Sequence, residues 1–412
     1  MQSVTDNNTG AGYIKSLDGL RAVAIIFVVF FHSPLPLFKL GFGWAGVNLF
    51  FILSGFLITR ILLHTASNPF PVYVKNFYLR RILRIFPLYF FYLLIAALIL
   101  FGLNTVFAGS EVFVSDGLSD LQRNYPLLLT YTYNFHEFFN YMANKSYNGS
   151  VFFGHLWSLS VEEQFYLLFP LLLYFLPVKK LNAVLLLTIA LVPFLRLLAV
   201  YWLRTKGQDP FWTGSVLYAG TFFQLDTLAL GACLAIFDCK KWVQYGWKIL
   251  CLLLILLAVA GFVHLYTLQQ FGLPAAKRSL GFDEPAVYLL YMTPYKIINH
   301  RYFYVIPLIN LAFATLLLLC INRKIWPSFF ENKLMVAIGK ISYGIYMYHL
   351  VFSYLYELAF RKIARIDIAA ANMFFQVLLM GVYLVLLYVI AWFSYMFFER
   401  RFLRMRGRLV FH

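Results

Sequence analysis

Long apolar runs separated by short polar segments extend along the chain from residue 22 to residue 398. Runs such as 250–263 are continuously apolar rather than alternating, which indicates membrane-spanning helices and not a transmembrane barrel. To within a few residues, the pattern predicts about ten such helices, at 19–37, 42–63, 86–107, 158–177, 182–202, 222–237, 246–266, 302–321, 334–358 and 372–398. The predicted fold is therefore an all-α, polytopic integral membrane bundle.

Composition supports this prediction. Of the 412 residues, 62% are hydrophobic and only 12% are charged, about half the charged fraction of soluble domains. The net charge of +17 would suggest a nucleic-acid partner in a soluble protein, but lipid headgroups and membrane topology explain it here. We expect one membrane domain over residues 1–412, with no appended soluble domain, embedded in the lipid bilayer and without a nucleic-acid partner.

The basic residues predict the orientation of the chain. If both termini lie in the cytoplasm, the inner segments hold 20 of the 34 Lys and Arg residues and the outer segments 12, with Arg60 and Arg196 inside helices. By the positive-inside rule this distribution favours an N-in, C-in topology. Two long connections, 108–157 and 267–301, then lie outside, and the aromatic and basic segment 64–85 is predicted to lie as an amphipathic stretch on the cytoplasmic surface.

The cysteines and the first apolar run suggest no catalytic or metal-binding role. Cys233, Cys239, Cys251 and Cys320 form no CxxC pair and fall within or beside apolar runs, so we interpret them as small buried residues rather than disulfides or metal ligands. No metal site is expected. The first apolar run follows no basic leader and no cleavage site, and it is predicted to be an uncleaved helix.

Two ionisable residues share a face of the first predicted helix. Arg21 and His32 are eleven residues apart, close to three helical turns, or about 16 Å. Arg21 then lies near the cytoplasmic surface and His32 well into the outer half of the membrane. An ionisable residue at such depth suggests function, although His32 also fits a helix-end histidine and Arg21 a basic residue that reaches the interface.

A second polar group lies at the outer end of the fourth predicted helix. It comprises His155, Trp157, Ser158, Ser160, Glu162, Glu163 and Gln164. Ser160 and Glu163 have the spacing of a capping box, which leaves Glu162 without a structural explanation. Arg196 is predicted to lie at a similar depth and to be able to neutralise one of the carboxylates, so a structural ion pair and a catalytic carboxylate both remain open.

Polar residues also recur in later helices. Asp226 lies in one apolar run, and Ser342, Tyr346 and His349 are spaced by four and three residues, which places them on one helical face. Hydrogen bonding inside the bundle and a substrate path explain this face equally well. Walker A, HExxH and GxSxG motifs are absent from the sequence, which disfavours nucleotide hydrolysis, zinc proteolysis and serine-hydrolase chemistry.

Seven segments, taken together and in order, resemble the acyltransferase-3 family of bacterial membrane acyltransferases, which includes polysaccharide O-acetylases. They cover nearly the whole chain and are LDGLRAVAIIFVVFFH (17–32), GWAGVNLFFILSGFLI (43–58), FYLRRILRIFPLY (77–89), HLWSLSVEEQFYLLFP (155–170), LDTLALGACLA (225–235), GKISYGIYMYHL (339–350) and FFERRF (397–402). Asn48 departs from the family, in which many members carry an acid at this position. We therefore assign Asn48 no acid–base role.

The resemblance implies a function and a set of site residues. The family's Arg-x10-His pair falls on Arg21 and His32, and its RxxR element falls on Arg81 and Arg84, with Arg80 beside them. These arginines would bind the phosphates of a cytoplasmic acyl-CoA, whose pantetheine arm would reach inward to His32. The acyl group, acetyl by family frequency, would pass to a hydroxyl of a carbohydrate or cell-envelope glycan, in the bacterial inner (plasma) membrane. The acyl-CoA is a co-substrate, and no permanently bound cofactor is expected.

The predicted mechanism is direct transfer with His32 as general base. Glu162 or Glu163 would orient the imidazole or bind acceptor hydroxyls, and the sequence does not choose between them. The remaining candidates for binding substrate are His155, Trp157, Ser158, Tyr346 and His349. An acyl-enzyme on His32, Ser158 or Ser160 is the alternative mechanism, and a transporter or flippase for a lipid-linked glycan is the alternative function. The sequence leaves homo-oligomer formation open.

Overall fold

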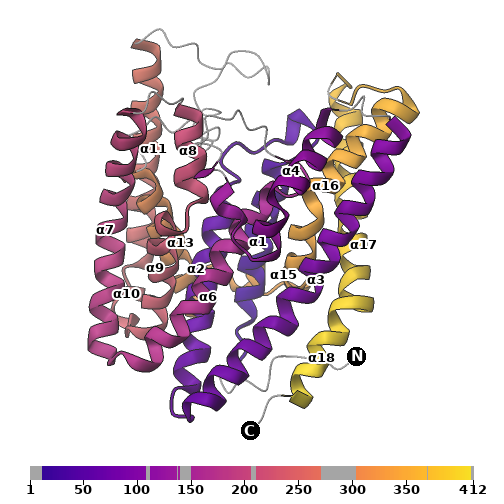
Figure 1. Ribbon diagram of the computed structural model, residues 1–412. Coiled ribbons are helices and arrows are strands. Elements are labelled where there is room, and N and C mark those ends of the chain that lie inside the picture. The colour runs from indigo at the N-terminus through magenta and orange to yellow at the C-terminus, as the bar shows by residue number, and fades with distance from the viewer. Residues whose placement is uncertain are drawn as a thin grey trace.

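The protein is a bundle of helices in a computed structural model that describes residues 12–107, 112–136, 138–139, 150–205, 210–270, 303–368 and 370–409 (Figure 1). Within these ranges the chain forms helices and connecting turns and no strand. The α-helices are α1 (Lys15–Phe31), α2 (Ala45–Thr65), α3 (Phe70–Phe107), α4 (Val112–Leu129), α6 (Trp157–Phe175), α7 (Val178–Thr205), α8 (Pro210–Ala219), α9 (Leu225–Ile236), α10 (Lys240–Val243), α11 (Gly246–Gln270), α13 (Val305–Ile321), α14 (Pro327–Phe330), α15 (Lys333–Lys340), α16 (Ser342–Ala359), α17 (Met373–Ser394) and α18 (Arg400–Leu409).

Short 3-10 and π segments join or extend these helices. The 3-10 turns are η2 (Pro36–Phe38), η3 (Tyr133–Phe135), η4 (Gly154–Leu156) and η5 (Thr221–Phe223), and the π segments are η8 (Phe360–Ala364) and η9 (Tyr395–Glu399). The η4 turn leads directly into α6, and η9 connects α17 to α18. The η4 turn carries His155 of the candidate site.

Each apolar run coincides with a helix, which confirms the all-α prediction for the described residues. Among the described residues, five helices are long and apolar enough to cross a membrane, α2, α3, α7, α11 and α17, or six if the bent pair α15–α16 counts as one span. Helices α9 and α13 are apolar but shorter. The chain is thus a multi-pass membrane protein by helix length and composition, while ten spans remain a prediction.

The segment 64–85 differs from the prediction of a stretch that lies on the membrane surface. From residue 70 it forms the first half of the 38-residue helix α3 and packs against α6. The Tyr73 hydroxyl donates to the Pro170 carbonyl at 3.0 Å, and the Tyr78 hydroxyl donates to the Leu167 carbonyl at 2.6 Å. The basic residues of this segment therefore stand beside α6, because the aromatic residues between them are used for helix packing.

The predicted helix 334–358 is two helices in the structure. The axes of α15 and the α16–η8 unit meet at 71°. The bend lies at Ile341, directly after a close helix contact, since the α-carbon of Gly339 lies against the backbone carbonyl of Asp18 in α1. Any side chain at Gly339 would overlap that carbonyl, so α1 and α15 approach at backbone distance.

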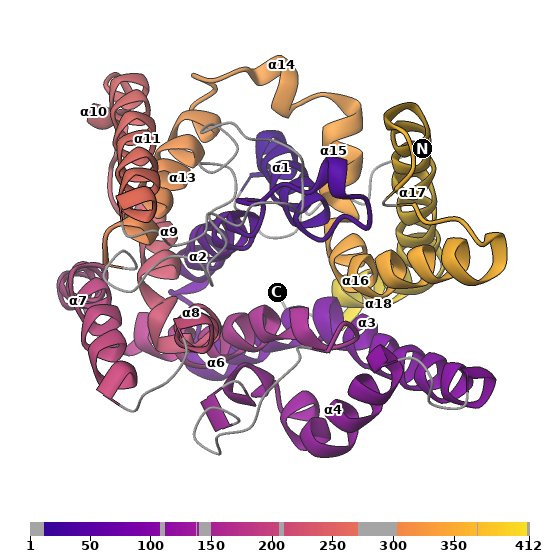
Figure 2. The same ribbon diagram turned by 90° about the horizontal axis from the view of Figure 1, so that it is seen from above.

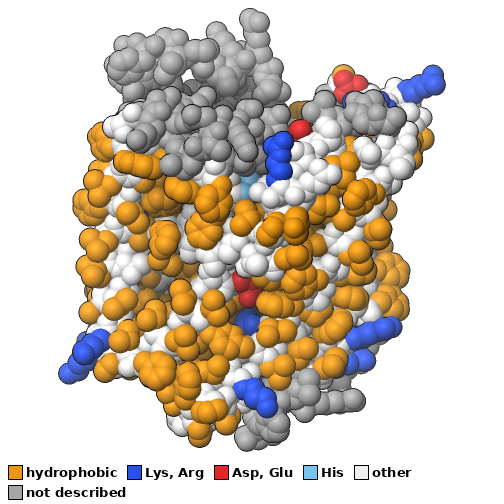
Figure 3. Space-filling model, viewed as in Figure 1, with side chains coloured by type: hydrophobic (Ala, Val, Ile, Leu, Met, Phe, Trp, Pro, Cys, Tyr) orange, Lys and Arg blue, Asp and Glu red, His pale blue; other side chains and the backbone are white. Residues whose placement is uncertain are grey.

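Helices α1 and α2 lie inside the bundle, with α7 and α11 on one side and α3 and α17 on the other (Figure 2). Contact between α2 and α9 is close because Gly55 faces the Leu228 carbonyl and Gly231 faces the Ile52 carbonyl. The peripheral helices expose apolar side chains, and Figure 3 shows an apolar belt with Lys and Arg side chains near its upper and lower ends. This distribution is the one expected of a bilayer-embedded surface.

Candidate active site

His32 is placed by the end of helix α1. The last helical residue is Phe31, and His32 caps the helix with its backbone N–H bonded to Val28 and Phe30 carbonyls. The predicted helix 19–37 is therefore shorter at its outer end, and the chain turns at Ser33, whose hydroxyl donates to the Leu35 carbonyl at 3.1 Å. The imidazole thus stands at a helix terminus inside the bundle rather than in the middle of a membrane span.

Arg21 is held at the other end of the same helix. Its guanidinium donates to the Asp18 carboxylate at 2.7 Å, and the Tyr13 hydroxyl donates to the second oxygen of the same carboxylate at 2.7 Å. The side chain of Arg21 is 22% exposed. The predicted pair of Arg21 and His32 therefore lies on one helix, with the arginine anchored by an aspartate within the first turn.

A second histidine lies against His32. The Nε2 atom of His349, in α16, is 3.2 Å from Nδ1 of His32, and the two ring centroids are 5.0 Å apart. His349 is completely buried. The sequence analysis had predicted this histidine as a substrate-binding residue, but not its contact with His32, because the two residues are 317 positions apart in the chain.

The hydrogen bonds of the pair define the tautomers of its neutral form. Nδ1 of His32 is 3.1 Å from the Val28 carbonyl, and Nδ1 of His349 is 2.6 Å from the Tyr346 carbonyl. Because a carbonyl can only accept, both Nδ1 atoms carry hydrogen. Nε2 of His349 is then an acceptor for His32 Nδ1–H, and Nε2 of His32 keeps its lone pair.

His155 completes a group that we call the histidine cluster: His32, His155 and His349. The ring of His155 is 5.4 Å from that of His349 and 5.5 Å from that of Tyr346. The Tyr346 hydroxyl donates to the His155 carbonyl at 2.8 Å and contacts the Ser158 hydroxyl at 2.5 Å. Four of the five predicted substrate-binding residues thus lie within or beside the cluster, and it joins α1, η4, α6 and α16.

Trp157 is the exception. Its ring packs against Tyr218 at 4.9 Å and Phe51 at 6.0 Å between centroids, away from the three imidazoles. The described residues also contain no group of three or more His, Cys, Asp or Glu side chains arranged to hold a metal ion. Within the cluster, His32 and His349 share a hydrogen bond, and His155 packs its ring against that of His349.

Glu162 makes contacts different from the predicted one with His32. Its carboxylate accepts from the Ser54 hydroxyl at 2.7 Å and from the Tyr166 hydroxyl at 3.0 Å, and none of the hydrogen bonds found for either glutamate in the described chain reaches His32. In the described chain the side chain that hydrogen-bonds to the His32 ring is that of His349, and the alternative, that Glu162 or Glu163 binds acceptor hydroxyls, stays a prediction. Sequence reasoning missed Ser54 and Tyr166, although Tyr166 follows Glu162 at helical spacing.

The predicted donor-binding arginines lie near the glutamates. The Arg81 guanidinium lies over the Tyr166 ring at 5.8 Å from its centroid, and Arg81 and Arg84 both interact electrostatically with Glu162. Arg81 also interacts with Glu163. The region therefore balances carboxylates with guanidinium groups inside the bundle, and Figure 3 shows acidic and basic atoms reaching the surface at mid-height of the apolar belt.

Two predictions about this region are corrected. Helix α6 begins at Trp157, without a side-chain cap, so Ser160 and Glu163 lie inside the helix and form no capping box; the Ser160 hydroxyl donates to the Leu156 carbonyl instead. Arg196 neutralises Asp226, at 2.6 and 2.9 Å, and not a glutamate of α6. The sequence pattern predicts how deep a residue lies in the membrane but not how each helix is rotated about its axis. It therefore does not identify such partners.

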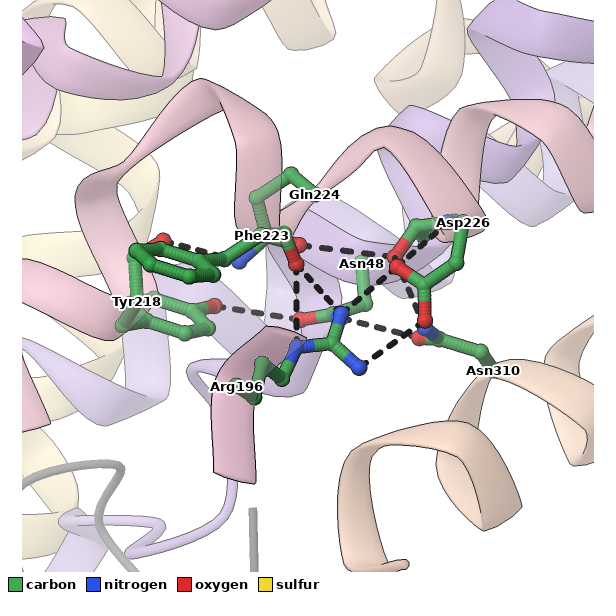
Figure 4. Close-up of polar contacts among 8 residues, drawn as sticks. Asn48, Arg196, Tyr218, Phe223, Gln224, Asp226 and Asn310 are labelled. Atoms are coloured by element: carbon green, nitrogen blue, oxygen red, sulfur yellow. Dashed lines mark hydrogen bonds and ion pairs between the residues drawn. The ribbon is translucent and has the colours of Figure 1, made fainter. Parts of the chain in front are cut away.

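The Arg196–Asp226 pair belongs to a satisfied network in the other half of the bundle (Figure 4). The Arg196 side chain is fully buried and also donates to the Phe223 carbonyl. Asn48 donates to Asn310 at 2.9 Å, and Asn310 donates in turn to Thr227 at 2.7 Å. Since these groups satisfy one another, the network connects α2, α7, α9 and α13 and serves as structure, in line with the absence of an acid–base role for Asn48.

Fold and site together define a multi-pass membrane protein with buried ionisable residues at two depths, a histidine cluster and a carboxylate–arginine region. The chain belongs to the acyltransferase-3 family, whose acyltransferase domain model matches residues 14–396. This confirms the family resemblance found in the sequence.

Named relatives agree with the family. The chain is 30% identical over 352 residues to O-acetyltransferase OatA of Staphylococcus aureus, which covers 82% of this chain and 50% of the relative. It is 37% identical over 238 residues to peptidoglycan O-acetyltransferase OatA of Listeria monocytogenes, covering 54% of this chain and 34% of the relative. The chain thus spans half or less of the length of these relatives. No solved structure matches it.

Proposed function

We propose that the protein is a membrane acyltransferase that transfers an acyl group, expected to be acetyl, from cytoplasmic acyl-CoA to a hydroxyl of a carbohydrate or cell-envelope glycan. Support comes from membership of the acyltransferase-3 family and from relatives named as O-acetyltransferases. The apolar belt and the concentration of basic residues in the predicted inner segments favour the inner membrane of a bacterium.

The observation that carries the proposal is the His32–His349 pair. With Nδ1–H of His32 held by Val28 and His349, the Nε2 lone pair of His32 is available as a general base. It takes the proton of the acceptor hydroxyl while the oxygen attacks the thioester carbonyl. The C–S bond then breaks as the tetrahedral intermediate collapses, and the imidazolium returns the proton to the leaving thiolate, which releases free CoA.

An acyl-enzyme on Ser158 or Ser160 receives less support from the geometry than direct transfer does. The hydroxyls of Ser158 and Ser160 donate to the carbonyls of His155 and Leu156, and neither has an imidazole as hydrogen-bond partner. An activated serine needs a base within hydrogen-bond reach. Direct transfer with His32 as the base is therefore the mechanism that we propose.

The donor is proposed to bind through Arg21, Arg80, Arg81 and Arg84. Guanidinium groups suit the phosphates of CoA, and Arg81 and Arg84 lie on α3 beside α6. We expect Arg81→Ala to raise the KM for acetyl-CoA at least tenfold with little change in kcat, because phosphate contacts bind the ground state and transition state equally. Steady-state transfer rates over a range of acetyl-CoA concentrations test this.

The test of the proposed function is transfer from radiolabelled acetyl-CoA by the purified protein, with and without a mixture of cell-envelope glycans. We expect label in the glycan and release of free CoA by the wild type, and no transfer by His32→Ala, which still binds acetyl-CoA. His64→Ala is the matched control, since His64 is exposed near the end of α2. Full activity of His32→Ala would refute the general base, and a wild type that neither binds nor consumes acetyl-CoA would refute the function.

A further inference from the structure

Two buried polar atoms between α3 and α6 have no hydrogen-bond partner among the described residues. They are Oε1 of Glu163 and the hydroxyl of Tyr131. Inside a bilayer each such group costs several kcal/mol, since no water is available to replace the missing bond. Buried groups of this kind in a native protein call for an explanation, of which a missing ligand is one.

The fold holds Tyr131 in place at a cost. Its backbone is left-handed, with φ of 54°, a conformation that bulky residues rarely adopt and that concentrates at functional sites. The ring is stacked on Tyr89 at 4.2 Å and on Phe86 at 5.1 Å, and the Gln164 side chain donates to the Tyr131 carbonyl at 2.9 Å. The side chain is 6% exposed, so the ring is fixed while its hydroxyl is left unbonded.

The open acceptor next to this ring is Glu163, one residue before the Gln164 that bonds to the Tyr131 carbonyl. Its carboxylate interacts electrostatically with Tyr131 and with Tyr89, whereas Glu162, one residue earlier, is satisfied by Ser54 and Tyr166. The two neighbouring carboxylates are therefore used differently. Glu162 belongs to a closed network, and Glu163 leaves an acceptor open beside a phenol that can donate.

The position along the helix indicates which substrate passes this place. Glu163 lies six residues after Trp157, about 9 Å along α6, beyond His155 in the preceding η4 turn and toward the helix end that leads to Lys179 and Lys180. In the predicted topology this end is cytoplasmic, and Arg81 lies beside the carboxylate. A donor entering from the cytoplasm toward the histidine cluster would pass between the arginines and His32 at this level.

We propose that Glu163 and Tyr131 form a subsite for the pantetheine arm of the acyl donor, in which Glu163 accepts an amide N–H and Tyr131 donates to an amide carbonyl. This inference rests on the proposed function. The arm is neutral and carries two secondary amides, so an acceptor and a donor side by side match its chemistry without introducing a second charge. The aromatic rings of Phe86 and Tyr89 keep water from competing for these bonds.

Donors of different length test the subsite. Acetyl-CoA carries the whole arm and its phosphates, S-acetyl-pantetheine carries the arm without them, and S-acetyl-N-acetylcysteamine keeps only the amide next to the sulfur. We expect Tyr131→Phe to raise the KM about fivefold for the first two donors, with kcat little changed. Glu163→Gln should raise it less, about threefold, because the glutamine carbonyl still accepts the amide N–H but without the negative charge. With the shortest donor, at least one of the two variants should show the KM of the wild type. Arg81→Ala should raise the KM for acetyl-CoA alone, because only that donor carries the phosphates.

Control variants distinguish a donor-binding subsite from a purely structural role of these residues. Tyr73→Phe removes a hydroxyl of α3 that is already bonded to the Pro170 carbonyl at 3.0 Å and should leave the KM for every donor unchanged. Because Tyr131→Phe removes a hydroxyl with an unmet hydrogen bond, its melting temperature should equal or exceed that of the wild type. Lower melting temperatures with an unchanged KM would overturn the subsite.

Two further outcomes also decide the question. A rise in the KM for the glycan acceptor, at saturating acetyl-CoA, would assign the subsite to acceptor hydroxyls and overturn the donor assignment. A wild type that consumes none of the three thioesters would refute the proposed function itself, whereas normal wild-type turnover with no change in the two variants would refute the subsite alone.

Discussion

Replacement of His349 tests whether its hydrogen bond to His32 orients the proposed general base. In His349→Phe the ring volume is approximately kept, but His32 Nδ1–H loses the acceptor that lies 3.2 Å away. The Val28 carbonyl, at 3.1 Å, remains. The tautomer with a free Nε2 is thus weakened and not abolished, in contrast with His32→Ala.

The magnitude follows from that partial loss. One hydrogen bond contributes about 1 kcal/mol, and up to about 2 kcal/mol when its partner becomes charged in the reaction. We therefore expect kcat to fall about 5- to 30-fold and the KM for acetyl-CoA to stay within about twofold, since His349 orients the base and does not bind the donor.

The assay is single-turnover and steady-state acetyl transfer by purified protein, with two companion variants. His349→Gln retains a side-chain carbonyl that can accept from His32 and should recover part of the rate. Tyr383→Phe removes the 3.4 Å contact of the Tyr383 hydroxyl with the His349 carbonyl and its hydrogen bond with Ser353. It leaves both imidazoles in place and should behave as wild type. A kcat for His349→Phe within twofold of the wild type, or a loss that His349→Gln does not relieve, would refute this role.

Three further predictions concern stability and mechanism. Arg196→Met should lower the free energy of unfolding by about 3–5 kcal/mol, because Asp226 is left as an unpaired buried charge. Adding Asp226→Leu should recover much of the lost stability in thermal unfolding assays, whereas a small loss in the single variant contradicts the argument. Gly231→Ala should cost about 1–3 kcal/mol or more, since a β-carbon would overlap the Ile52 carbonyl, whereas Gly381→Ala, with open space around it, should not destabilise. Ser158→Ala should keep transfer within about tenfold of the wild type, and complete loss with a normal fold would favour the acyl-enzyme.

Hydrophobic periodicity predicted the helices well because membrane burial acts on every residue of a span. The continuous run at 246–266 became α11, and the spacing of Ser342, Tyr346 and His349 placed all three on the buried side of α16. Arg21 and His32 lie at the two ends of one helix as expected. These are local features, fixed by the 3.6-residue repeat alone.

The predictions that proved wrong concern side chains whose partners are determined by tertiary contacts. The partner of Arg196 depends on the rotation of α7 relative to α9, and the partner of His32 depends on how α16 approaches α1. Neither follows from one-dimensional patterning. The false capping box at Ser160 has a local cause, since the η4 turn leads into α6 at Trp157, three residues before the serine, and leaves Ser160 inside the helix.

The backbone contact between Gly339 and Asp18 has a consequence for the proposed general base. Helix α1 is attached to the α15–α16 unit at two points, near its beginning through that contact and at its end through the His32–His349 pair. Two separated attachments fix both spacing and rotation, so α1 and α15–α16 act as one stationary body. In the proposed reaction, donor and acceptor therefore meet a base whose position relative to His349 is fixed by these two contacts.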